Sequence, residues 1–130
     1  MVPVAESEWR QWADESLSAV DQQIKDAQRQ AETATTFRAQ VGQVRGRATS
    51  QYGEVTAVTD TAGRLLDLQL TADALQRDPR ELATLVVATA DEARRQAGAQ
   101  ALTMAEEAFG AGSAVVTRLA ADLEPDHRPA

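Results

Sequence analysis

The sequence predicts an α+β fold in which a long helix, a small antiparallel β-meander of two to three strands and a second long helix follow one another. Three observations support this fold. Apolar residues recur every three or four positions between residues 9 and 44, which is the spacing of one helix face. Between residues 54 and 70 apolar and polar residues alternate, as strands do. Asp78-Pro79 then marks the start of another helix.

The first helix is expected over residues 1–45, and no proline or glycine interrupts it between Ser7 and Gly42. About 38 helical residues would span about 57 Å, whereas a compact domain of this length has a diameter of roughly 36 Å. We therefore expect a second helix, from this chain or from a second copy, to cover the stripe as in a coiled coil. The apolar stripe comprises Trp9, Ala13, Leu17, Val20, Ile24, Ala27, Ala31, Ala34, Phe37, Val41 and Val44.

The β-meander is expected over residues 46–71. Residues 54–59 and 65–70 form its two strands, and Gly63 supplies the positive φ of the short loop between them. Residues 47–50 are a candidate for a third strand at the edge. Because so small a sheet is not stable alone, we expect a helix to cover its apolar face.

The second long helix is expected over residues 78–109. Asp78 is its N-cap, and Glu81 stands three residues later, as in a capping box. Leu75 is expected to fill the connection between sheet and helix. A short helix should follow over residues 113–123. We expect residues 1–124 to form one domain and residues 125–130 to form a disordered tail.

The composition argues against an enzyme. The chain contains no cysteine, and its one histidine, His127, is the fourth residue from the end. Thiolate zinc sites, cysteine nucleophiles and an oriented histidine base are therefore excluded or improbable. We predict no catalytic, cofactor or metal site. Adjacent carboxylates such as Asp14 and Glu15 point in different directions on a helix and are expected to be solvated.

No segment approaches the ~18 apolar residues of a membrane span. The first residues are acidic, whereas a signal peptide begins with basic residues. We therefore expect a cytoplasmic protein that does not contact a membrane.

The net charge, 13 − 20 = −7, is unevenly distributed. Residues 1–26 carry −4, whereas residues 27–50 carry four arginines and one glutamate, or +3. Arg38 and Arg45 are seven residues apart, so a continuous helix would place them on one face. These arginines either contact phosphate or form a solvated face that pairs with carboxylates. The candidate nucleic-acid-binding residues are Arg29, Arg38, Arg45, Arg47, Arg94 and Arg95.

Trp9 and Trp12 are two of only five aromatic residues. Aromatic side chains can stack on bases, but this segment is acidic. The tryptophans are better interpreted as helix-packing anchors or as a surface that binds a protein partner.

Several short motifs occur in a fixed order between residues 41 and 101, and together they resemble the YbaB/EbfC family of nucleoid-associated proteins. No single motif is diagnostic; the ordered combination carries the resemblance. The motifs are Ala48-Thr49-Ser50, Gly53, Val55-Thr56-Ala57-Val58-Thr59, Gly63-Arg64-Leu65, Leu66-Asp67-Leu68 and Asp78-Pro79-Arg80-Glu81-Leu82.

The resemblance implies an α–β–β–β–α subunit that forms a homodimer with tweezer-like helical arms. Such a bacterial protein binds duplex DNA weakly and with little sequence preference. The acidic first segment departs from the family, in which that segment tends to be rich in lysine, glutamine and methionine. Divergent actinobacterial relatives, which this composition resembles, include some associated with type VII secretion. The alternative is therefore a protein-interaction scaffold or chaperone-like module with little or no DNA binding.

Overall fold

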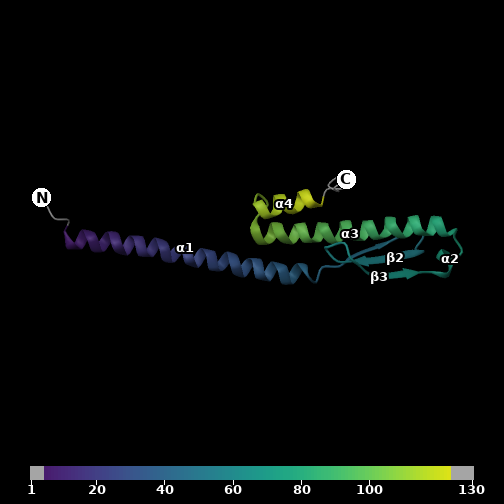
Figure 1. Ribbon diagram of the computed structural model, residues 1–130, viewed down its shortest axis with the longest axis horizontal. Helices are drawn as coiled ribbons and strands as arrows, with labels where there is room; N and C mark the ends of the chain where they lie inside the picture. Colours follow the sequence, from purple (N-terminus) through teal and green to yellow (C-terminus); the bar gives the residue numbers. More distant parts are fainter. Residues whose placement is uncertain (1–4, 124–130) are drawn as a thin grey trace. The chain divides into compact units, whose positions relative to one another are not determined.

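The computed structural model describes residues 5–123 of the 130-residue chain. The predicted α+β order is confirmed, including the third strand, whereas the predicted tail at 125–130 lies outside the described residues. The chain divides into two units, residues 1–36 and residues 37–130. The elements, labelled in Figure 1, are α1 (Glu6–Val41), β1 (Gly46–Thr49), β2 (Val55–Thr59), β3 (Leu65–Leu70), α2 (Ala72–Leu75), α3 (Pro79–Phe109) and α4 (Ala114–Asp122).

Helix α1 is 36 residues long and contains no buried residue. It ends at Val41 rather than at the predicted residue 45. Gly42 follows, and Val44 N donates a hydrogen bond to Val41 O at 3.1 Å, which tightens the chain into a turn. In the second unit, the ring of Phe37 packs edge-on against Phe109 at the end of α3, with 5.2 Å between ring centroids.

The three strands form an antiparallel sheet in the order β1-β2-β3. Gly53 and Gly63, with φ of 75° and 84°, occupy the two connections, where a left-handed backbone favours glycine. Alternate residues of β1 and β2 are buried, and Ala48, Ala57 and Ala93 make the core between the sheet and α3. Figure 1 shows α3 lying across this face of the sheet.

The expected covering helix therefore exists, but it covers only part of the sheet. Every residue of β3 is exposed, and Leu68 and Leu70 retain 36% and 39% of their surface. These two leucines pair with Ala57 and Val55, so they lie on the α3 side of the sheet. The third strand thus carries an apolar edge that α3 does not cover.

The connection between β3 and α3 corrects one expectation. Leu75 does not fill it, because its side chain is 65% exposed, whereas Ala74 is fully buried. An ion pair holds the connection instead. Arg77 donates from Nη2 to Glu54 Oε1 at 2.7 Å and from Nε to Glu54 Oε2, and this hydrogen bonding lowers the pKa of Glu54.

The predicted caps of the later helices are present. Asp78 accepts a hydrogen bond from Arg80 N at 3.2 Å and begins α3, and Ser113 accepts one from Val116 N at 3.2 Å and begins α4. Helix α4 packs along α3 in the second unit (Figure 1). The Leu123 side chain lies directly over Gly98, so a larger residue at this position would require that side chain to move.

Candidate nucleic-acid interface

The six candidate arginines fall into three different surroundings. Arg29 lies on α1 in the first unit and pairs with Asp26, three residues earlier on the same helix. Both side chains are more than half exposed. Such exposed pairs contribute little to stability, and the guanidinium remains reachable from solvent.

Arg38, Arg45 and Arg47 lie together around the end of α1 and the start of β1. We call residues 38–47 the arginine segment. The sequence contains no aspartate or glutamate between residues 33 and 53. None of the three arginines forms an ion pair with a residue in the described range 5–123. Their charge is therefore not balanced by a neighbouring carboxylate.

Arg45 does not lie on a helix, so the predicted helical face shared with Arg38 is wrong. A turn at Gly42 separates the two residues instead. Gly42 N donates to Arg38 O at 3.0 Å, and Arg45 Nη1 donates to Gly42 O at 3.0 Å and to Val44 O at 2.9 Å. The Arg45 side chain thus folds back onto the turn that follows α1, whereas Arg38 stays on the last turn of the helix. The hydrogen bonds to carbonyls orient the Arg45 guanidinium and leave its positive charge in place.

The arginine segment is anchored to α3 by a close backbone approach. A Cβ atom on Gly46 would lie 1.8 Å from the carbonyl oxygen of Ala93, so only glycine fits there. Gln100 Nε2 also donates to Arg45 O at 3.2 Å. Arg47 follows on β1 at an exposed position, between buried Gly46 and buried Ala48. It therefore points to the face of the sheet opposite α3.

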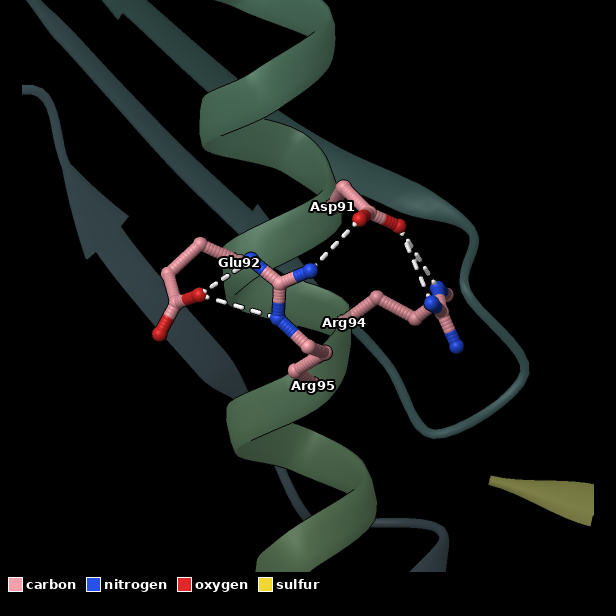
Figure 2. A network of polar contacts seen from close by, with 4 residues as sticks. All are labelled: Asp91, Glu92, Arg94 and Arg95. Atoms are coloured by element: carbon pink, nitrogen blue, oxygen red, sulfur yellow. Dashed lines mark hydrogen bonds and ion pairs between the residues drawn. The ribbon is translucent and has the colours of Figure 1, made fainter. Parts of the chain in front are cut away.

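Arg94 and Arg95 on α3 belong to a network with Asp91 and Glu92, shown in Figure 2. Arg94 Nη2 lies 2.9 Å from Asp91 Oδ1, and Arg95 Nη1 lies 2.9 Å from Asp91 Oδ2. Arg95 Nη2 also donates to Glu92 Oε2 at 2.5 Å, and this hydrogen bond raises the pKa of Arg95. Two arginines and two carboxylates make the group neutral.

Arg94 also has a packing role. A Cβ atom on Gly63 would lie 3.0 Å from Arg94 Cδ, so the stem of Arg94 lies against the loop between β2 and β3. The side chain is 30% exposed. Phosphate would have to compete with Asp91 for both α3 arginines. The arrangement favours the arginine segment as the anion-binding surface.

Trp9 and Trp12 lie one helical turn apart on α1. Their rings are stacked, with 5.3 Å between centroids and 24° between planes, and the two residues are 60% and 59% exposed. A stacked pair of indoles at the surface is an unusual amount of apolar area to leave in water. It is suited to protein contact.

A surface that the sequence interpretation missed lies beside the uncovered strand. A groove of about 830 Å³ runs between β3 and α3, lined in part by Leu65, Ala83, Val86, Val87 and Ala90. Val87 is 69% exposed and Leu65 is 44% exposed. The leucines at 65, 66, 68 and 70 could have predicted this surface from the sequence. One helix is too narrow to cover three strands, so some of these leucines have to stay exposed.

The described residues hold no group of three or more histidine, cysteine, aspartate or glutamate side chains placed to bind a metal ion. Within the same part of the chain, no helix combines the length and the apolar character that crossing a membrane requires.

Comparison with protein families gives a match. A model described as the YbaB/EbfC DNA-binding family matches residues 17–112. This range includes the whole arginine segment, the sheet and α3. No curated protein matches the chain.

Proposed function

Because the chain belongs to the YbaB/EbfC DNA-binding family, we propose that it is a nucleoid-associated protein whose homodimer binds duplex DNA weakly and with little sequence preference. The family is described by DNA binding and not by a catalysed reaction. We place the protein on the nucleoid in the cytoplasm, without a cofactor.

The arginine segment is the proposed contact with DNA. Three arginines in a stretch without carboxylates, held beside α3 by Gly46, are the observation that carries this proposal. Arginine donates to phosphate oxygens in a geometry that suits the sugar-phosphate backbone. Backbone contacts carry no sequence information, which accounts for weak preference. Arg29, Arg94 and Arg95 are secondary contacts, because each already has a carboxylate partner.

The groove between β3 and α3 is the proposed surface of the homodimer. Its lining is mostly apolar and it borders an edge strand. A second copy would cover Leu65 and Val87 in the groove and Leu68 beside it on the same face of β3. Dimerisation doubles the number of arginine segments that can contact one duplex. This raises the affinity of a protein in which each segment binds only weakly. Leu68→Asp should abolish this contact and lower the sedimentation coefficient at micromolar concentration. Gln69→Asp, on the opposite face of the same strand, should leave the dimer intact.

The experiment that tests DNA binding is an anisotropy titration of a fluorescent duplex at about 50 and 200 mM salt, because phosphate contacts release counterions and weaken steeply with salt. We expect measurable binding at the lower salt and a loss of at least about tenfold at the higher. Absence of binding at the lower salt would overturn the proposal.

The exposed tryptophan pair favours a second candidate function, a protein-interaction scaffold or chaperone-like module of the kind associated with type VII secretion. In that case α1 would hold another protein and DNA binding would be absent. The same titration separates the two candidates, since only the nucleoid-associated protein binds the duplex.

A further inference from the structure

Helix α1 presents a long apolar face to solvent. Leu17, Val20 and Ile24 are 68%, 51% and 51% exposed, and Trp9 is 60% exposed. A long helix without a buried residue gains little from tertiary packing, which is the main source of helix stability in proteins. We call this face the arm stripe; it comprises Trp9, Ala13, Leu17, Val20, Ile24, Ala27, Ala31 and Ala34.

The sizes of the side chains along the arm stripe indicate what covers it. The large residues occupy its first two thirds, from Trp9 to Ile24, whereas the rest is alanine. If a second arm stripe ran antiparallel and were centred near residue 22, the numbers of facing residues would sum to about 44. Leu17 would face Ala27, Trp9 would lie beside Ala34 and Val20 would face Ile24 of the other copy. Trp9 and Leu17 would then meet alanines, and Val20 and Ile24, of similar size, would meet each other, which is how facing helices fill space. A parallel pair would set Trp9 against Trp9 and leave gaps between the alanines.

The charges along α1 favour the same direction. Residues 6–26 carry two bases and six acids, 2 − 6 = −4, whereas residues 27–41 carry two bases and one acid, 2 − 1 = +1. A parallel pair would align two segments of −4 within a Debye length of each other. An antiparallel pair places each acidic segment beside the weakly positive end of its partner.

We propose that the arm stripe pairs with the arm stripe of a second copy of this chain in antiparallel orientation. This contact is separate from the groove between β3 and α3. A chain with two self-complementary surfaces assembles beyond the dimer. The protein would therefore form tetramers or longer chains of dimers, each dimer bringing its own arginine segments.

Cysteine cross-linking tests the orientation without interference, because the chain has no native cysteine. A mixture of Leu17→Cys and Ala27→Cys proteins should form a disulfide-linked heterodimer under mild oxidation, while neither variant should cross-link to itself. Gln22→Cys, on the opposite face of α1, is the control and should stay monomeric on a denaturing gel. Self-cross-linking of Leu17→Cys would mean parallel pairing, and no cross-link in the mixture would mean another occupant; either result overturns the proposal.

Tryptophan emission tests the pairing itself, since both tryptophans of the chain lie on α1. Dilution should shift the emission to longer wavelength as Trp9 becomes exposed. Val20→Asp with Ile24→Asp should show the long-wavelength emission at every concentration, and should reduce the assembly to a dimer in sedimentation. Ser18→Asp with Gln22→Asp adds the same charge to the opposite face and should behave as the unmodified chain.

The same measurement separates this contact from the proposed dimer and from DNA binding. Leu68→Asp should abolish the groove contact and leave the concentration-dependent emission shift, and no DNA is present in either assay. Emission that does not change with dilution, in a chain shown by circular dichroism to be helical, would overturn the arm pairing and leave the proposed function untouched.

Discussion

The arginines of α3 and those of the arginine segment are the same kind of side chain in opposite surroundings. Arg94 and Arg95 follow Asp91 and Glu92 by three or four residues on one helix, and the four charges cancel. Arg38, Arg45 and Arg47 occupy a stretch without a carboxylate and form no ion pair within residues 5–123. We call the first group the paired arginines and the second the unpaired arginines, and we propose that the unpaired arginines bind DNA.

This contrast explains how an acidic chain can belong to a DNA-binding family. The net charge of −7 describes the whole molecule, whereas phosphate meets a local surface. Arg77 also belongs with the paired arginines, because its partner is Glu54. Pairing therefore distinguishes arginines that already have a carboxylate partner from the arginines that we propose as the contact with DNA.

The largest effect is expected at the anchor of the arginine segment. Gly46→Ala would place a Cβ 1.8 Å from the carbonyl oxygen of Ala93, and relieving that overlap should cost about 3 kcal/mol of unfolding free energy. Gly112→Ala, with no atom within 4 Å of its new Cβ, should change stability by less than about 0.5 kcal/mol. Urea titration measures both, and equal values would mean that β1 can move away from α3 at little cost.

Reversing the charge of two unpaired arginines should weaken DNA binding. Arg38→Glu with Arg47→Glu is expected to raise the Kd for duplex DNA by at least about tenfold and to flatten its salt dependence by about two phosphate contacts per chain. Arg94→Glu with Arg95→Glu makes the same change in charge and should have the smaller effect. A larger effect from the α3 pair would reverse the assignment of the two groups.

Removing the carboxylate partners of the paired arginines on α3 should have the opposite effect and strengthen DNA binding. Asp91→Asn with Glu92→Gln removes the carboxylates that neutralise Arg94 and Arg95, and should tighten DNA binding a few-fold at low salt. The matched control is Glu106→Gln with Glu107→Gln, which makes the same change in charge further along α3. If both variants tighten binding equally, net charge decides the affinity and local pairing does not.

The smallest effect concerns acid stability. The hydrogen bonds from Arg77 lower the pKa of Glu54 below its usual 4.5, so the pair stabilises the fold above that pH and its contribution disappears as the pH falls through the lowered pKa. The urea midpoint should therefore fall with acidification in the native chain and fall less in Glu54→Gln. Parallel curves for the two proteins between pH 7 and 3 would show that the pair does not contribute.

Parts of the candidate site could have been read from the sequence with the same rules that predicted the helices. Asp91 and Glu92 precede Arg94 and Arg95 at the spacing of neighbours on a helix surface. The pairing of Arg29 with Asp26 follows the same spacing. The end of α1 at Val41 was harder to predict, because Val44 continues the apolar spacing even though it lies in a turn and is buried there.

The sequence by itself determined the order of the elements, their caps and the lack of carboxylates around Arg38, Arg45 and Arg47, because periodicity, capping and composition are local properties of the chain. Only the tertiary structure decided that Gly46 must lie against Ala93, that Arg45 turns back onto Gly42, and that the leucines of β3 stay exposed. Those outcomes depend on how closely α3 approaches the sheet and on how many strands one helix can cover. Both are set by packing between residues far apart in the sequence.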